Sequence, residues 1–228
     1  MSEIMRTEGL IRSFHSGREV VHALKGVSIH IEQGKLTLLK GRSGSGKTTL
    51  MNLLGALDKP NEGKIWFKDK DIVHAGEMYR DELRRKNIGF IFQSVALISM
   101  MSAYENVEFG LRVSGFSAKE RKYRAEECLA LVGLAKRMHH RPQEMSGGEQ
   151  QRVAIARAIS HKPDVVFADE PTAELDSHMG LQVMRLFKTM VEKEGLTVVI
   201  TTHDPSMFEI ADHAYTLEDG EIVDERKG

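Results

Sequence analysis

The sequence has no excess of charge of either sign. Its 228 residues contain 32 lysines and arginines against 33 aspartates and glutamates, which gives a formal net charge of −1 at pH 7. A protein that is steered to nucleic acid by its charge normally shows a basic excess. We therefore expect no nucleic-acid partner.

Long apolar runs and cysteine pairs are also missing. No window of 18 apolar residues occurs, so nothing in the sequence is expected to span a membrane, and MSEIMRTEGLIRSF at the N-terminus has no apolar core of the signal-peptide type. The single cysteine, Cys128, cannot form an internal disulfide, which fits a reducing cytosol. We expect a cytoplasmic protein whose connection to any membrane runs through a partner.

Four short apolar runs end in polar residues that can bind a ligand or take part in catalysis. Each is rich in β-branched or aromatic residues and apolar on both faces, as in a strand buried within a parallel sheet. They are KLTLLKG (35–41), IGFIFQ (88–93), DVVFADE (164–170) and TVVITTHD (197–204). Helical patterns alternate with them, so the sequence predicts an α/β domain. Ligands bind at the carboxyl ends of such strands. The polar residues at these ends are Gln93, Asp169, Glu170, His203 and Asp204. The alternative is that the strands end in polar residues simply because they reach the protein surface there.

The segment GRSGSGKT (41–48) matches the phosphate-loop pattern G-x-x-x-x-G-K-[ST]. Its glycines allow backbone N–H groups to surround phosphate oxygens, and the helix that follows points its positive end at the same place. Lys47 is expected to reach the β- and γ-phosphates, and the Thr48 hydroxyl to bind Mg²⁺. The nucleotide-binding residues predicted here are Gly41, Ser43, Gly44, Ser45, Gly46, Lys47, Thr48 and Thr49.

Two further features complete the predicted nucleotide site. Asp169 is placed to hold the magnesium ion and Glu170 to accept a proton from the attacking water, although a carboxylate pair after a strand can also be a surface turn. The sequence has no Asn-Lys-x-Asp motif for guanine, so ATP is the expected nucleotide. Phe14 is the candidate to stack on adenine, and its alternative is a strand residue that packs inward.

The stretch MSGGEQQR (145–152) contains a capping box, in which Ser146 begins a helix and Glu149 follows three residues later. A capped helix explains these two residues and does not explain the glycine pair between them. Each glycine weakens a helix by about 1 kcal/mol relative to alanine. Gly147 and Gly148 would, however, leave the N–H groups of the first turn open to an anion.

Together these motifs resemble those of the ATP-binding subunits of ABC transporters. GRSGSGKT, Gln93, MSGGEQQR, VVFADEPT, ELD (174–176) and His203 occur in the order and rough spacing of that family, and the likeness runs from Phe14 to LEDGEIVDE. Stretches such as GALDKPNEGKIWF, LRRKNIGFIFQ and FADEPTAELDS are most similar to the MacB, LolD and FtsE type.

The resemblance implies a role for each matching residue. The catalytic residues are then Glu170, His203, Gln93 and Lys47; the Mg²⁺ ligands are Thr48, Gln93 and Asp169; and Phe14 stacks on adenine. The signature residues Ser146, Gly147, Gly148 and Glu149 contact ATP held by a second copy of the chain, with Ser146, Gly148 and Asp176 at the dimer interface.

The resemblance also implies the fold and the partners. We expect an ABC-type P-loop ATPase, one domain over 1–228, whose mainly parallel core sheet is flanked by helices. The core and an N-terminal antiparallel β part cover about 1–93 and 161–228, and a helical signature subdomain covers about 94–160. ATP hydrolysis in a homodimer would drive a separate permease on the inner face of the membrane. Export, extraction, mechanotransmission and import all stay open, and so does the cargo.

The sequence departs from the family pattern at three places. Met145 and Glu149 replace the usual leucine and glutamine of the signature, and AELD (173–176) differs in its first two residues. After Gln93, SVALISMMSAYENV replaces a Leu-Leu-Pro run in the segment that should face the permease. The methionine pair, Met100 and Met101, either receives a permease helix or fills the core of the helical part. Exposure of both side chains would favour the first hypothesis.

Two other classes share the phosphate loop. ABC-type ATPases that act on DNA separate the two nucleotide motifs by a long coiled coil, whereas here about 120 residues without heptads lie between Thr48 and Asp169. A small-molecule kinase would have no use for the signature helix. Both are kept as alternatives to a transporter ATPase.

Overall fold

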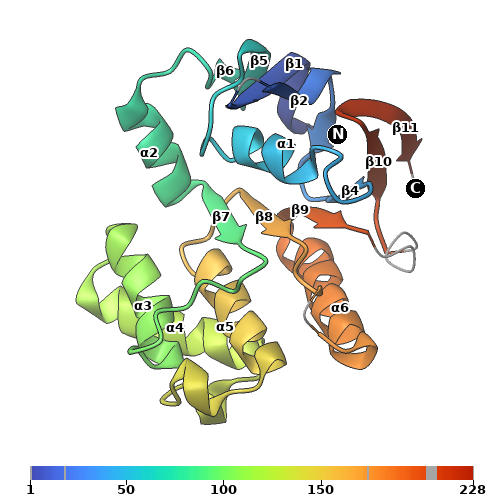
Figure 1. Ribbon diagram of the computed structural model, residues 1–228. Helices are drawn as coiled ribbons and strands as arrows, with labels where there is room; N and C mark the ends of the chain where they lie inside the picture. Colours follow the sequence, from blue (N-terminus) through green and yellow to red (C-terminus); the bar gives the residue numbers. More distant parts are fainter. Residues whose placement is uncertain (1, 18, 174, 204–209, 228) are drawn as a thin grey trace.

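The structure, a computed structural model, describes residues 2–17, 19–173, 175–203 and 210–227 (Figure 1). A six-stranded sheet at its centre has the order β11-β10-β4-β9-β8-β7, and every neighbouring pair is parallel except β10 and β11. Its strands are β4 (Leu36–Lys40), β7 (Ile88–Ile91), β8 (Val165–Asp169), β9 (Thr197–Thr202), β10 (His213–Glu218) and β11 (Glu221–Lys227). The prediction of an α/β domain with a mainly parallel sheet is confirmed, and the four predicted strands are neighbours.

A second, antiparallel sheet is built from the N-terminal part of the chain, as expected. It contains β1 (Glu3–Ser16), β2 (Glu19–Val27), β3 (His30–Glu32), β5 (Glu62–Phe67) and β6 (Lys70–Asp71). Helix α1 (Lys47–Leu54) lies between the two sheets in Figure 1. Its buried Leu50 and Leu53 share one core with Ile4 of β1 and Phe167 of β8. This packing fixes the direction of α1, and with it the position of the phosphate loop at its N-terminus.

The remaining helices pack on both faces of the central sheet. They are α2 (Glu77–Lys86), α3 (Ala103–Val113), α4 (Ala118–Leu131), α5 (Gly147–Ile159) and α6 (Ser177–Glu194), with short 3₁₀ turns at Ala135–Arg137 and Pro142–Glu144. Helices α3 to α6 share one core on the face opposite α1, whereas Leu83 of α2 belongs to the core that contains α1. Capping boxes begin α3, α4 and α5, each a serine followed three residues later by a glutamate. The range 94–160, for which a helical subdomain is expected, contains these three helices. Within the described ranges, none of the helices is long and apolar enough to cross a membrane.

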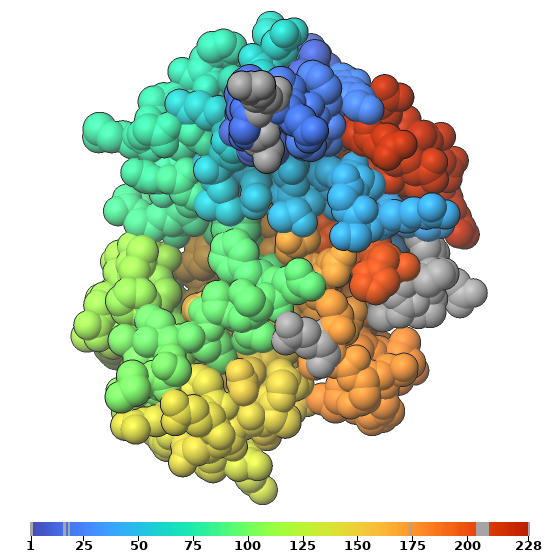
Figure 2. Space-filling model, viewed as in Figure 1, coloured from blue at the N-terminus to red at the C-terminus, as the bar shows by residue number. Residues whose placement is uncertain are grey.

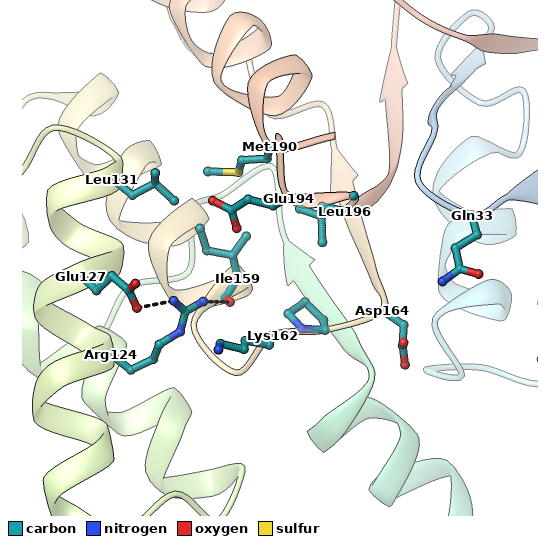
Figure 3. A pocket seen from close by; sticks show the side chains of 12 residues that line it. Gln33, Arg124, Glu127, Leu131, Ile159, Lys162, Asp164, Met190, Glu194 and Leu196 are labelled. Atoms are coloured by element: carbon teal, nitrogen blue, oxygen red, sulfur yellow. Dashed lines mark hydrogen bonds and ion pairs between the residues drawn. The ribbon is translucent and has the colours of Figure 1, made fainter. Parts of the chain in front are cut away.

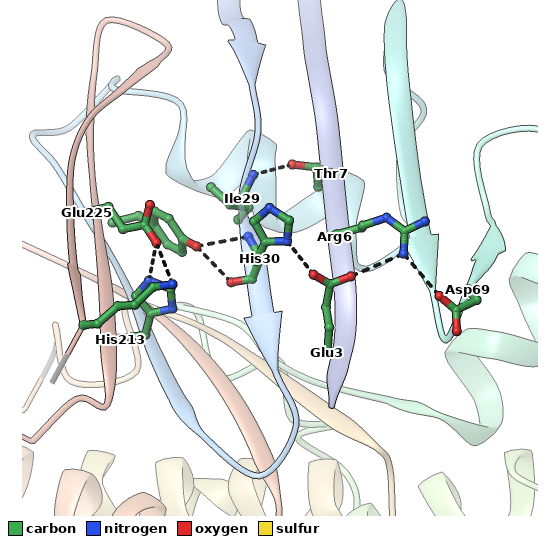
Figure 4. A network of polar contacts seen from close by, with 10 residues as sticks. Glu3, Arg6, Thr7, Ile29, His30, Asp69, His213 and Glu225 are labelled. Atoms are coloured by element: carbon green, nitrogen blue, oxygen red, sulfur yellow. Dashed lines mark hydrogen bonds and ion pairs between the residues drawn. The ribbon is translucent and has the colours of Figure 1, made fainter. Parts of the chain in front are cut away.

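Tyr215 of β10 joins the two sheets through His30 of β3, whose polar contacts are drawn in Figure 4. Its hydroxyl donates to the carbonyl of His30 and accepts from the His30 N–H, both at 3.0 Å. Burial raises the pKa of Tyr215 to about 12, so the hydroxyl stays protonated at physiological pH. The turn after β10 then reaches the phosphate loop, where Gly220 N–H donates to the carbonyl of Ser45 at 3.1 Å.

Cys128 lies on the inner face of α4 and is fully buried. Burial raises the pKa of its thiol to about 11 from an ordinary value near 9. Because thiol reagents attack the thiolate, a rise of two pKa units leaves about 100-fold less reactive species at pH 8. We expect a chromogenic disulfide reagent to label the native chain at least about 100-fold more slowly than the chain in denaturant. Equal rates in the two states would show that Cys128 is accessible.

Candidate active site

The phosphate loop forms a tight turn between β4 and α1. Gly44 and Gly46 have φ of 81° and 104°, and a Cβ on Gly46 would lie 2.4 Å from the carbonyl oxygen of Ala23, so only glycine fits there. Lys47 is 5% exposed. Its Nζ donates to the carbonyls of Gly41 at 2.8 Å and Arg42 at 3.0 Å. Positive charge and the N-terminus of α1 therefore meet at one point, as an anion site requires.

Asp169 and Glu170 are held by two threonines. The Thr48 hydroxyl donates to Asp169 Oδ2 at 3.0 Å, and the Thr201 hydroxyl donates to Asp169 Oδ1 at 2.5 Å. Thr201 also accepts the N–H of Glu170 at 2.8 Å. Glu170 has a φ of 43°, so its backbone turns sharply out of the strand direction of β8. Thr201, which the sequence analysis did not select, thus positions both carboxylate residues.

The predicted catalytic residues come together at the carboxyl ends of the strands. Gln93, Glu170, Lys47 and Thr48 line one pocket of about 290 Å³. The exposed His203 places its Nδ1 3.5 Å from Glu170 Oε1. Asp204 and Glu174 lie outside the described residues.

The oxygen atoms at this site fit Mg²⁺. A hydroxyl from Thr48, a carboxylate from Asp169 and a side-chain amide oxygen from Gln93 are hard oxygen donors of the kind this ion prefers. Mg²⁺ commonly uses only one or two protein carboxylates and keeps several waters. No group of three or more His, Cys, Asp or Glu side chains that could hold a metal occurs in the described part of the chain.

Phe14 lies beside this pocket. It pairs in register with Val21 of β2, and Val21 lines the pocket, so the Phe14 side chain is on the same face of the sheet. The ring is 41% exposed rather than packed into the core. Arg12 lies over it, with the guanidinium carbon 4.6 Å from the ring centroid, and Asp58 holds this guanidinium through two bonds of 2.8 and 2.9 Å.

The signature turn begins α5 with the predicted capping box. Glu149 N–H donates to Ser146 Oγ at 3.2 Å, and Ser146 N–H donates to Glu149 Oε2 at 2.9 Å. This second bond lowers the pKa of the Glu149 carboxyl, and Arg137 at 3.3 Å acts in the same direction. The Glu149 carboxylate is therefore held by two groups of its own chain, the Ser146 N–H at the N-cap of α5 and the Arg137 guanidinium.

The two signature glycines have different surroundings. A Cβ on Gly147 would meet nothing within 4 Å, whereas one on Gly148 would lie 2.6 Å from Met179 Cε of α6. Gly147 lines a separate crevice of about 190 Å³ together with Gln93 and Glu170, and none of its lining residues belongs to the phosphate loop. Asp176, predicted at a dimer interface, is exposed and caps α6 by accepting the N–H groups of residues 178 and 179 at 3.0 Å.

Comparison with known proteins gives the class. The model of the family described as ABC transporter matches residues 24–173. The chain is 41% identical over 229 residues to an ABC transporter ATP-binding protein of Thermotoga maritima, covering 100% of this chain and 97% of the relative. It is 40% identical to the ABC transporter ATP-binding protein MJ0796 of Methanocaldococcus jannaschii, covering 98% and 97%. The chain belongs to the ABC transporter family, of which it is an ATP-binding cassette.

Structures and longer relatives refine this assignment. Two solved structures of MJ0796, both described as dimeric and one as a post-hydrolysis state bound to ADP and Pi, match with a TM-score of 0.91 at 38% identity over 98% of each chain. The fold is therefore that of an ABC ATPase cassette, as expected. The macrolide export ATP-binding/permease protein MacB 2 of Yersinia pestis is 43% identical over 223 residues, which are 98% of this chain and 33% of that protein. The chain spans about a third of the length of the MacB relatives that it matches.

Proposed function

We propose that two copies of this chain bind two ATP molecules at a shared interface and hydrolyse them to drive a membrane permease. One observation carries the proposal. The phosphate loop, Gln93 and Glu170 share a pocket, whereas the signature turn at Ser146 lies outside it with Gly147 open to the surface. A second copy can bring its own signature turn to this pocket in a two-fold arrangement. The MJ0796 structures, both described as dimeric, support the proposal of two copies.

Each residue at the site has a chemical task in this proposal. Thr48, Asp169 and Gln93 would hold a Mg²⁺ ion, which when bound would supply positive charge beside the phosphates. Lys47 offsets the charge that develops as the γ-phosphate is transferred to water. Glu170 orients that water and accepts its proton, with His203 close to the γ-phosphate. Phe14 stacks on adenine from the side opposite Arg12. Ser146, Gly147 and Gly148 of the second copy cover the γ-phosphate, and Asp176 lies at the interface.

An exposed apolar groove supports a permease partner. Its volume is about 420 Å³, and its apolar lining includes Phe92, Ile98, Phe109 and Val113, which are between 38% and 53% exposed. Contiguous apolar surface of this kind marks protein contact sites. Met100 is 70% exposed and Met101 is half-buried, so only one of the two methionines has the exposure that would favour contact with a permease helix.

The MacB relatives carry an ATP-binding part and a permease part in one protein, by their names. We therefore favour a system of the MacB, LolD and FtsE type, which exports, extracts or transmits force, over an importer. The chain would then work at the inner face of the membrane, bound there through its permease. We keep the proposal that residues 94–160 form a helical signature subdomain.

Phosphate release from ATP tests the proposed function directly. We expect release that requires Mg²⁺, that is abolished by chelation, and that rises when the chain is reconstituted with its permease in lipid vesicles. Stimulation by DNA, ribosomes or a small-molecule phosphate acceptor in place of the permease would contradict the proposal and favour one of the alternative classes.

The groove yields a separate prediction. Replacing Phe109, on the exposed side of α3, with Asp places a charge in the apolar groove. We expect the Phe109→Asp variant to lose permease stimulation while its basal hydrolysis stays within about twofold of the parent chain. Tyr123→Asp is the matched control, because Tyr123 is an exposed aromatic residue on α4 outside the groove. Equal stimulation of the two variants would place the permease elsewhere.

A further inference from the structure

The segment that follows Gln93 has a strained backbone. Val95 and Ala96 have φ of 56° and 47°, although neither is glycine, and positive φ is rare for a β-branched residue. The Ala96 N–H donates to the carbonyl of Ser94 at 2.5 Å, which closes a three-residue turn. Such a conformation persists only where its surroundings hold it in place.

Arg157, on α5, holds this turn. Its Nη1 donates to the carbonyl of Ala96 at 2.6 Å, and its Nη2 donates to the carbonyl of Val95 at 3.2 Å. Burial of the guanidinium lowers the pKa of Arg157. Among the residues that the structure describes, no carboxylate forms an ion pair with it. The carbonyls of Val95 and Ala96 therefore compensate the charge of the guanidinium. Because a partly desolvated charge is costly without hydrogen-bond partners, these two bonds are expected to persist.

Asn106 of α3 holds the other end of the same segment. Its Nδ2 donates to the carbonyls of Ile98 at 3.2 Å and Met101 at 3.1 Å, and its Oδ1 accepts the Ile98 N–H at 2.8 Å. On the surface, this segment (green) lies above the yellow stretch that carries the signature turn (Figure 2). The crevice beside it is lined by Gln93 and Val95 and by Gly147 of α5.

We propose that Arg157 is a positioning residue for Gln93, which it connects to the signature helix through the carbonyls of Val95 and Ala96. The inference rests on the proposed role of Gln93 in ATP hydrolysis. A shift of α5 against the core then moves the turn, and the turn moves Gln93 toward or away from the Mg²⁺ and water of the pocket. Geometry errors of about 1 Å at such a residue cost on the order of 100-fold in rate.

The first test replaces Arg157 with Met, which keeps much of the side-chain length and removes the donors. The matched control is Arg124→Met. Arg124, on α4, donates to the carbonyls of Ile159 and Ser160 at the C-terminal end of α5, the same end that carries Arg157, and Figure 3 shows its contacts with Ile159 and Glu127. We expect hydrogen exchange of the amides in 94–96 to quicken at least about 10-fold in Arg157→Met and to stay unchanged in Arg124→Met. Unchanged exchange in Arg157→Met would overturn the proposal.

The second test is kinetic. In Arg157→Met we expect kcat to fall about 10- to 100-fold, the Mg²⁺ concentration for half-maximal hydrolysis to rise, and the Kd for ATP to stay within about twofold. Arg157→Lys, which keeps the charge and one donor nitrogen, should recover part of the loss in kcat. It replaces Arg157→Met in this test if the Met variant does not fold.

A double variant separates this inference from the proposed function. If Arg157 acts through Gln93, then Gln93→Ala with Arg157→Met turns over no more slowly than Gln93→Ala alone. If the fold-losses in turnover of the two single variants instead multiply in the double variant, the positioning role is overturned while the proposed function is left intact. If Gln93→Ala alone leaves turnover unchanged, the proposed role of Gln93 fails, and the positioning role fails with it.

Discussion

Replacing Glu170 with Gln should lower kcat for ATP hydrolysis by about 10²- to 10⁴-fold and leave ATP binding intact. The substitution keeps the shape of the side chain and removes its capacity to accept a proton from water. The backbone bond from Glu170 N–H to Thr201 is unaffected, so the neighbouring Asp169 keeps its position. Phosphate release measures the first effect, and the fluorescence of a trinitrophenyl-ATP analogue measures the second.

Glu192→Gln, on an exposed position of α6, is the matched control for this prediction and should hydrolyse ATP at the normal rate. If Glu170→Gln turned over ATP at nearly the parent rate, Glu170 would have no catalytic role. A variant that had lost ATP binding would instead show that the substitution disturbs the phosphate site itself.

Replacing Gly147 with Asp should abolish ATP-dependent dimerisation and lower hydrolysis by more than about 100-fold. The Cβ of an aspartate at the first position of α5 meets no atom within 4 Å, and an acidic residue at a helix N-terminus is stabilising. In the proposed dimer, however, the same side chain puts a negative charge against the γ-phosphate held by the other copy. The chain should therefore stay folded and bind ATP as a monomer.

Two companion variants show whether charge or size causes this effect. Gly147→Asn has the shape of aspartate without its charge and should retain part of the activity. Gly148→Ala should keep the thermal midpoint at or above that of the parent chain, because its Cβ meets only the flexible end of Met179 and alanine favours a helix over glycine. A fall in the thermal midpoint of Gly147→Asp by more than a few degrees would show that Gly147 is needed for the fold rather than for the interface.

The features that the sequence predicted are local ones. A strand that ends in Asp169 and Glu170, a glycine loop before a helix, and the Ser146 capping box are each contained in fewer than about ten residues. The parallel sheet then brings the ends of separate strands together, so Gln93 and Glu170 reach one pocket although they are far apart in the sequence.

The features that the sequence did not predict depend on pairings across the fold. Thr201 is one polar residue inside an apolar run, and its task follows only from its register beside Asp169 in neighbouring strands. Arg12 meets Asp58 and the ring of Phe14 because β1 passes close to the chain that follows α1. These contacts carry no signal at fixed sequence spacing, so they become visible only once the strands are placed.

The mass of Glu170→Gln in solution tests the central claim, that the site is completed by a second copy of the chain. Light scattering should give the 25.6 kDa of one chain without nucleotide and twice that mass with saturating Mg²⁺ and ATP. The slowed hydrolysis of this variant should allow the ATP-bound dimer to accumulate. Gly147→Asp in the Glu170→Gln background should stay at the mass of one chain. If Glu170→Gln itself kept the single-chain mass while saturated with ATP, the proposed composite site would be wrong.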